Sequence, residues 1–152
     1  MTDTHAQQDE IWRRAMALLA RREHAPAELA AKLQRRGFDS ADVAHVLAAL
    51  SAEDLLSAQR YATAVVNARS ARGYGPLRIR NELAQKQIDE QLIEQALAAA
   101  EVDWFALAVA TCAKRFGTAA AADYKERARR MRFLQRRGFD FDCIRAAVAD
   151  AG

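Results

Sequence analysis

The chain has 152 residues, of which 51% are hydrophobic, 28% are charged and only two are proline, and its formal net charge is +3. This alanine-rich composition is typical of a helical protein. Because the sequence has no run of 18 apolar residues, we expect no membrane-spanning segment.

The N-terminal segment is polar and acidic, unlike a signal peptide, and we expect residues 1–8 to be disordered. Apolar residues then recur at spacings of three and four, as on one face of a helix. In a first helix these residues are Ile11, Ala15, Leu18 and Leu19. A second helix begins near Pro26, a residue that suits the first helical position. In a third helix the apolar residues are Val43, Val46 and Leu47.

Between the second and third helices lies a segment that occurs more than once. Residues 33–39 read Leu-Gln-Arg-Arg-Gly-Phe-Asp, and the same seven residues return at 134–140. A degraded copy at 83–89 keeps the leucine, a basic residue, an apolar residue and the aspartate. A period of about 50 residues indicates one supersecondary unit used three times.

The repeated segment predicts a helix end, a tight turn and a new helix start. Gly37 and Gly138 suit the left-handed residue that follows a helix, with the leucine and phenylalanine of each copy in contact. Gln87 takes the glycine position in the middle copy, where a side chain is strained. The aspartates should cap the next helix of each unit; they are Asp39, Asp89 and Asp140.

We therefore predict an all-α fold of three tandem three-helix repeats, about nine helices that form an elongated, curved array. The first repeat spans residues 9–51, the second 52–100 and the third 101–150. Ser51 and Asp54 match a capping box at the start of the second repeat. Cys112 and Cys143 fall on apolar helix faces, which favours buried thiols in a reducing compartment.

Charge is distributed unevenly along the repeats. Residues 114–137 carry nine basic and two acidic residues, a net charge of +7 that leaves −4 for the rest of the chain. Arginine dominates this segment, and its guanidinium group suits bidentate contacts to phosphate or carboxylate. Nucleic acid, an acidic protein face, or both are the partners that this charge favours.

From charge and motif position we nominate nine residues that contact a partner protein or DNA. They are Arg127, Arg129, Arg130, Arg132, Arg136 and Arg137 in the third repeat, and Arg78, Arg80 and Lys86 in the second. A structural role stays open for the cations in last helical turns, which complement the helix dipole. The nearby aromatic residues are expected in the core rather than as base-stacking platforms; they are Tyr124, Phe133 and Phe139.

The sequence contains no constellation typical of an enzyme. His5, His24 and His45 lack the spacing of a metal site, and we expect His24 and His45 at the surface. Residues 73–76, Gly-Tyr-Gly-Pro, lack the lysine and the preceding strand of a phosphate-binding loop, so they indicate a turn between helices. We expect no catalytic residue, no metal and no cofactor.

Three segments resemble motifs of the RecX family. Residues 19–33, which begin Leu-Ala-Arg-Arg-Glu-His, are similar to the opening motif of that family. Residues 73–83, Gly-Tyr-Gly-Pro-Leu-Arg-Ile-Arg-Asn-Glu-Leu, resemble its most specific signature, and residues 133–139 resemble its C-terminal motif. The resemblance runs from about residue 10 to 149. Gln87 departs from it, since the family more often has glycine there.

The resemblance implies a non-catalytic, cytoplasmic regulator of the bacterial RecA recombinase. Such proteins lie along the groove of the RecA–DNA filament and suppress strand exchange, ATP hydrolysis and the co-protease activity that drives the SOS response. We therefore expect a monomer that binds RecA filaments and DNA, single- or double-stranded and without sequence preference, and no membrane.

Two alternatives remain at the level of the sequence. A stand-alone DNA-binding protein of helix-turn-helix type would place one helix of a unit in a groove, and its binding to naked duplex would be strongly salt-dependent. A helical-repeat scaffold for another protein would show no preference for RecA.

Overall fold

The computed structural model describes residues 3–150, and within that range the chain forms nine helices and no strand. In chain order the helices are α1 (Asp3–Arg21), α2 (Pro26–Arg35), α3 (Ser40–Ala52), α4 (Ala58–Ala71), α5 (Pro76–Gln85), α6 (Glu90–Ala99), α7 (Trp104–Phe116), α8 (Tyr124–Arg137) and α9 (Phe141–Asp150). The predicted all-α fold of three three-helix repeats is confirmed.

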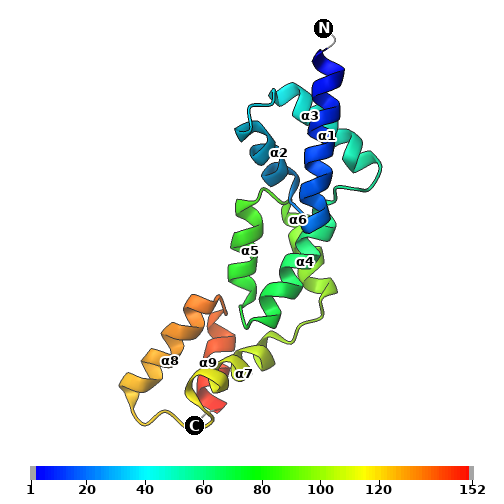
Figure 1. The fold of residues 1–152 in the computed structure, drawn as a ribbon. Coiled ribbons are helices and arrows are strands. Elements are labelled where there is room, and N and C mark those ends of the chain that lie inside the picture. The colour runs from blue at the N-terminus through cyan, green and yellow to red at the C-terminus, as the bar shows by residue number, and fades with distance from the viewer. Residues whose placement is uncertain (1–2, 151–152) are drawn as a thin grey trace.

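The three units follow one another along an elongated, curved molecule, with α1 at one end and α8 and α9 at the other (Figure 1). Within each unit the first and third helices make the most extensive contacts, α1 with α3, α4 with α6 and α7 with α9. The second helices α2, α5 and α8 lie along the same side of the molecule, on the left in Figure 1.

Each unit has its own apolar core. The helix-face residues Val43, Val46 and Leu47, expected from sequence spacing, are confirmed in the core of the first unit. The third helices of the other units bury matching residues, which are Ile93, Ala96 and Leu97 in the second and Ile144, Ala147 and Val148 in the third. The cores also reach across the unit boundaries. Ala25 of the first unit is buried in the second core, Leu56 packs in the first, and Trp104 contacts the second and third. The exact limits of the three repeats, at residues 9–51, 52–100 and 101–150, stay a prediction.

The turn of the repeated segment has the predicted geometry. Gly37 and Gly138 both have a φ angle of 94°, and Gln87 has a φ angle of 60°. The amide of the residue after the turn reaches back to the leucine carbonyl, at 3.2 Å for Phe139 and at 3.1 Å for Ile88. The aspartate caps are also confirmed, because each carboxylate accepts a bond from an amide of the next helix; the pairs are Asp39 with Ala41, Asp89 with Gln91 and Asp140 with Cys143.

Two expectations about helix starts are wrong. Residues 3–8 are not disordered but form the first turns of α1, and the Gln8 side chain donates a hydrogen bond to Asp42 of α3; residues 1 and 2 lie outside the described residues. The capping box at Ser51 and Asp54 does not form, because α3 continues to Ala52. The hydroxyl of Ser57 caps α4 instead.

The second and third units meet through their backbones. The amides of Gly75 and Leu77, at the start of α5, donate to the carbonyls of Arg137 and Gly138 at 2.7 and 2.9 Å. A Cβ atom at Gly75 would lie 2.4 Å from the Gly138 oxygen. The end of α8 therefore caps the start of α5, and the Gly-Tyr-Gly-Pro segment is both the predicted turn and the contact between two units.

The first and second units meet through side chains. Glu28 of α2 accepts hydrogen bonds from Arg22 at 2.7 and 3.2 Å, and its Oε2 lies 3.6 Å from Nζ of Lys86 in the second unit. Glu23 accepts a bond of 2.9 Å from Arg60 of α4. Ion pairs across this boundary take the place of the backbone bonds that join the second and third units.

No single helix among residues 3–150 is long and apolar enough to cross a membrane. The helices α6 and α7 reach that length and apolarity only together, as a pair bent by 75°. Their apolar residues are already buried, Ile93 and Leu97 in the second core and Ala108 and Cys112 in the third.

Candidate partner-binding surface

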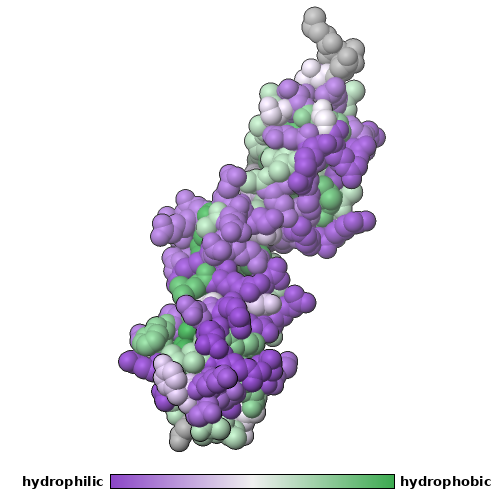
Figure 2. Space-filling model, turned by 90° about the vertical axis from the view of Figure 1, so that its left-hand side faces the viewer, coloured by the Kyte–Doolittle hydropathy of each residue, from purple (hydrophilic) through white to green (hydrophobic). Residues whose placement is uncertain are grey.

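The nominated cations belong to the second helices of two units, or lie just after them. Figure 2 turns the side that carries α2, α5 and α8 toward the viewer, and hydrophilic residues cover most of that face. The structure thus places helices far apart in sequence on one polar side of the molecule.

Four of the nominated arginines are exposed on α8: Arg127, Arg129, Arg132 and Arg136. Arg129 makes a loose contact of 3.4 Å with Glu126 and keeps 55% of its side chain exposed. No carboxylate of the described residues lies within 4.0 Å of the other three. These guanidinium groups are exposed, and their contact with a partner molecule stays a prediction.

Arg130 is different from its neighbours, because only 5% of this residue is exposed. Its Nη1 donates to the carbonyl of Ala119 at 2.8 Å, and its Nε donates to Glu126 at 3.3 Å. The side chain thus holds the loop between α7 and α8 against the helix. We withdraw Arg130 from the contact surface and assign it a structural role.

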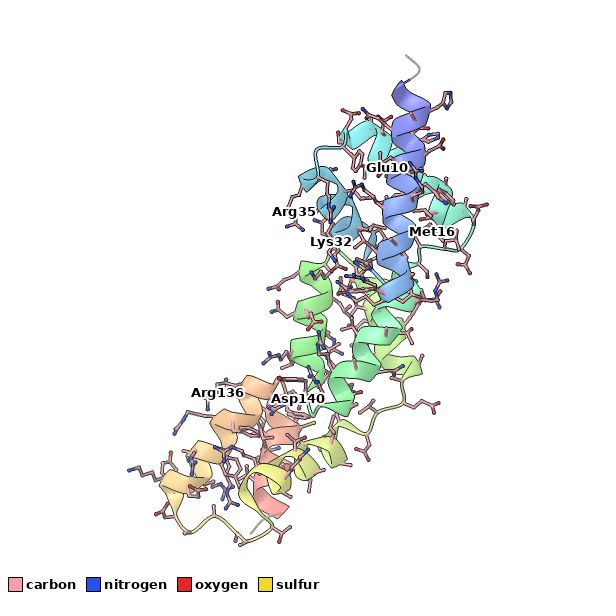
Figure 3. All side chains as sticks on the ribbon, in the orientation of Figure 1. Glu10, Met16, Lys32, Arg35, Arg136 and Asp140 are labelled. Atoms are coloured by element: carbon pink, nitrogen blue, oxygen red, sulfur yellow. The ribbon has the colours of Figure 1, made fainter. Side chains whose placement is uncertain are left out.

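The cations of α5 and α8 converge at the joint between the second and third units. Nη1 of Arg78 donates to the carbonyl of Arg136 at 3.3 Å, and Nη1 of Arg137 donates to the carbonyl of Arg72 at 3.0 Å. The guanidinium carbons of Arg78 and Arg137 lie 4.2 and 4.6 Å from the ring centre of Tyr74. Cation–π contacts at these distances hold two like charges together at the joint. Figure 3 labels Arg136 on α8 at this joint.

The two remaining nominees already have acidic partners. Arg80 forms two hydrogen bonds with Glu94 of α6, at 2.8 and 3.0 Å. Lys86 is the side chain that faces Glu28 across the joint of the first and second units. Both cations thus have an acidic partner within the fold, and their contact with a partner molecule stays a prediction.

Aromatic residues near α8 divide between core and surface. Phe139 is buried as expected, and Phe133 is half-buried and packs edge-to-face on Phe116 at 5.3 Å. Tyr124 is 85% exposed, so its expected place in the core is wrong. Arg115 and Arg129 lie 5.1 and 5.4 Å from the centre of the Phe116 ring. The sequence did not predict this cluster, because Arg129 of α8 approaches α7 only in the folded chain.

His24 is also misplaced by the sequence reading, since only 1% of it is exposed. Its Nδ1 lies 3.1 Å from the carbonyl of Arg22, and its Nε2 lies 2.9 Å from Nζ of Lys32. The ring therefore donates through Nδ1 and accepts from the ammonium group. Burial lowers the pKa of His24, in keeping with a neutral ring. His45 is exposed as expected.

The thiols of Cys112 and Cys143 are both buried, which confirms their expected place on apolar helix faces. Burial raises the pKa of Cys112, and burial together with the neighbouring Asp140 raises the pKa of Cys143 to about 12. Since the thiolate is the reactive form, neither residue is a nucleophile at neutral pH. The described residues contain no group of three or more histidine, cysteine or acidic side chains arranged to hold a metal ion.

Comparison with known proteins agrees with this architecture. Family models of the first, second and third RecX three-helix domains match residues 12–50, 59–97 and 101–148. The regulatory protein RecX of Halorhodospira halophila is 46% identical over 99% of this chain and 94% of its own length. That of Chromohalobacter salexigens is 42% identical over 90% of each chain.

A crystal structure of RecX from Lactobacillus salivarius has the same fold, with a TM-score of 0.81 at 20% identity over 97% of both chains. The three matched domains coincide with the three helical units seen here. With curated relatives that are named regulatory proteins and match almost the full length, the chain belongs to the RecX family.

Proposed function

We propose that this chain binds RecA nucleoprotein filaments and inhibits their strand exchange, ATP hydrolysis and co-protease activities, without catalysing a reaction itself. Family membership supports a role in regulating RecA in general. The observation that carries the finer proposal is the set of exposed arginines on α8, to which the exposed Arg78 of α5 adds a further cation beside the end of α8.

The elongated shape suits binding along a filament. Arginines on separate units offer several weak contacts on one chain, and each contact raises the effective concentration of the next. Phosphate and carboxylate groups are bound most strongly by guanidinium, which donates two parallel hydrogen bonds. The contacts we propose are to acidic protein surface and to DNA phosphates without base readout, by a monomer in the cytoplasm.

Charge reversal on α8 tests the proposal. The Arg127→Glu/Arg132→Glu variant should raise the concentration needed for half-inhibition of RecA-dependent ATP hydrolysis about tenfold, because two attractive contacts become repulsive. The matched control is Arg13→Glu/Arg145→Glu, which changes the net charge equally at exposed residues of α1 and α9. The control should inhibit as the unmodified chain does.

Equal inhibition by both variants would remove α8 from the contact surface. Failure of the unmodified chain to inhibit, together with tight and strongly salt-dependent binding to naked duplex DNA, would favour the stand-alone DNA-binding protein instead.

A further inference from the structure

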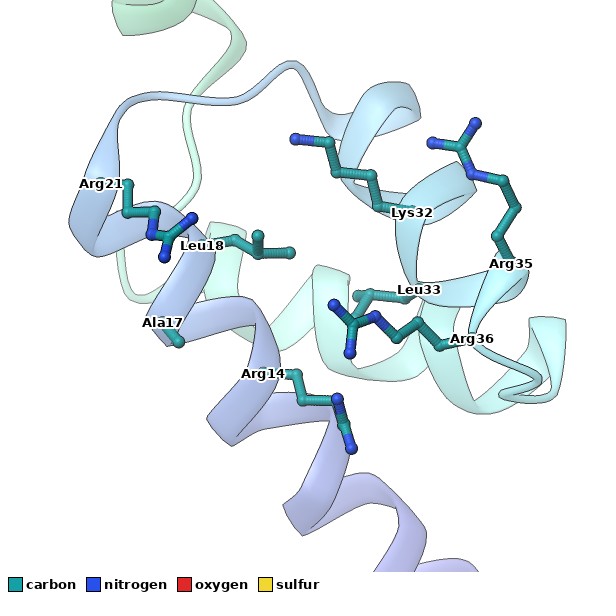
Figure 4. A pocket seen from close by; sticks show the side chains of 8 residues that line it. All are labelled: Arg14, Ala17, Leu18, Arg21, Lys32, Leu33, Arg35 and Arg36. Carbon is teal, nitrogen blue, oxygen red and sulfur yellow. The ribbon is translucent and has the colours of Figure 1, made fainter.

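A second basic surface lies at the opposite end of the molecule from α8, in a cleft between α1 and α2 of the first unit (Figure 4). The cleft has a volume of about 590 Å³. Its lining consists of Arg14, Ala17, Leu18 and Arg21 from α1 with Lys32, Leu33, Arg35 and Arg36 from α2 and its end. None of these residues was nominated as a contact from the sequence.

The rim of the cleft is cationic. Five of the eight lining residues are arginine or lysine and none is acidic. Arg14 is paired with Glu10 at 3.0 Å, and Lys32 faces the neutral ring of His24. No carboxylate of the described residues pairs with Arg21, Arg35 or Arg36.

Five cations around one cleft repel one another, so the ligand that the cleft favours is negatively charged. Burial lowers the pKa of the Lys32 ammonium group, and the charge of Arg22 adds to this effect.

Exposed apolar surface in the cleft distinguishes it from the basic surface on α8. Leu18 is half-buried and Ala17 is exposed at the edge, whereas Leu33 is buried and presents almost no surface to a ligand. A nucleic-acid backbone presents hydrated phosphates and gains little from such apolar surface. A peptide that combines carboxylates with an aliphatic or aromatic side chain uses both features, with ion pairs at the rim and a buried anchor at the centre.

We propose that the cleft between α1 and α2 binds an acidic peptide segment of a protein partner, with an apolar side chain of that segment seated on Leu18. The inference deepens the proposed function by dividing its contacts: the first unit binds protein, whereas the arginines of α8 bind nucleic-acid phosphate. It rests on the proposed function only for the identity of that partner protein, since peptide binding is measured without RecA.

Two cleft variants and two matched controls make the test. Arg35→Gln/Arg36→Gln removes two charges from the rim, and Ala17→Glu adds a carboxylate at the edge. Arg127→Gln/Arg132→Gln removes two charges from α8, and Ala20→Glu adds a carboxylate to an exposed position of α1 that does not line the cleft. Circular dichroism establishes that each variant is folded.

The probes are three fluorescein-labelled molecules whose binding is followed by anisotropy. One is a short synthetic peptide of glutamate and leucine, the second is a peptide of glutamate alone, and the third is a single-stranded oligothymidylate. Both cleft variants should weaken binding of the glutamate–leucine peptide about tenfold and leave oligonucleotide binding within about twofold, because only the rim or the edge of the cleft is changed. The glutamate-only peptide should bind more weakly, since it lacks the anchor.

The two controls should differ from the cleft variants in which probe they affect. Arg127→Gln/Arg132→Gln should weaken binding of the oligonucleotide and leave binding of the peptide unchanged. Ala20→Glu should leave the binding of both probes unchanged. If the cleft variants weaken oligonucleotide binding as much as the α8 variant does, the cleft is a nucleic-acid site and the proposal is overturned. Equal affinity for the two peptides would also overturn it, because the apolar surface of the cleft would then have no part in binding.

The two proposals fail in distinguishable ways. If the unmodified chain does not inhibit RecA-dependent ATP hydrolysis but binds the glutamate–leucine peptide through the cleft, the proposed function fails and the acidic-peptide site stands. If it inhibits hydrolysis but the peptide does not bind, the site fails alone.

Discussion

At the scale of single residues, glycines in identical local sequences have different structural roles. Gly37 and Gly138 occupy the same place in the same seven-residue segment and have the same φ angle of 94°. A Cβ atom at Gly37 would meet nothing within 4 Å, whereas one at Gly138 would lie 2.4 Å from Cβ and 2.6 Å from the backbone nitrogen of Arg78. Gly37 is therefore required for its conformation only, and Gly138 also for the contact between two units.

This difference predicts unequal effects of alanine. Gly37→Ala should lower the free energy of unfolding by about 1–2 kcal/mol, the cost of a left-handed residue with a Cβ atom. Gly138→Ala should lower the free energy of unfolding by more than Gly37→Ala does, because α5 must also move away from the turn. Urea unfolding measures both, and hydrogen exchange of the Gly75 and Leu77 amides should rise in Gly138→Ala alone. Equal costs and equal exchange would contradict our account of the joint.

Much of the residue scale could be predicted from the sequence, because the determinants are local. The glycine turns and the aspartate caps involve residues within six positions of one another. Arg130 and His24 escaped prediction because their burial depends on the loop after α7 and on the approach of α2 to α1. The residues next to an arginine or histidine in the sequence do not indicate that such distant contacts will bury its side chain.

At the scale of elements, the two joints between units are built from different chemistry. The start of α5 is capped by the backbone at the end of α8, whereas the start of α2 is held by ion pairs around Glu28. Burial alone would raise the pKa of Glu28, but the hydrogen bond and charge of Arg22, the amide of Ala25 and the charge of Lys86 lower it to about 2. The start of α2 should therefore respond to acid, chiefly through the bonds of Glu28 to Arg22 and Ala25 and to a smaller extent through Lys86 of the second unit.

The sign of this response follows from the pKa of Glu28, which is lower in the folded chain than its ordinary value of 4.5. Its contribution to stability is complete above pH 4.5 and is lost as the pH falls toward 2. Glu28→Gln should therefore lower the free energy of unfolding by about 2 kcal/mol at pH 7, and the difference from the unmodified chain should narrow on acidification. Urea titrations of both proteins at several pH values between 7 and 3 measure this difference in the free energy of unfolding.

The control for this prediction is Glu94→Gln, which breaks the ion pair with Arg80 on an exposed surface. Exposed pairs contribute little, so this variant should differ from the unmodified chain by less than about 0.5 kcal/mol at any pH. A loss in Glu28→Gln that stays constant from pH 7 to 3 would show that the carboxylate charge does not hold the joint.

At the scale of the whole molecule, the repeat brings three second helices to one polar side. The sequence predicted the repeat and the surplus charge, but not which arginines stay free. That outcome depends on acidic residues supplied by other helices, such as Glu94 for Arg80 and Glu28 for Lys86. The cleft of the first unit could not be predicted from the sequence either, because its rim combines cations from two helices.

The most direct measurement of our central claim is RecA-dependent ATP hydrolysis on single-stranded DNA, titrated with the unmodified chain. A protein that spans several filament contacts should inhibit hydrolysis at substoichiometric ratios to RecA, and inhibition should weaken as salt concentration rises. Hydrolysis that stays unchanged even at equimolar chain, at low salt, would contradict the claim that this arginine-bearing helical array acts on the filament.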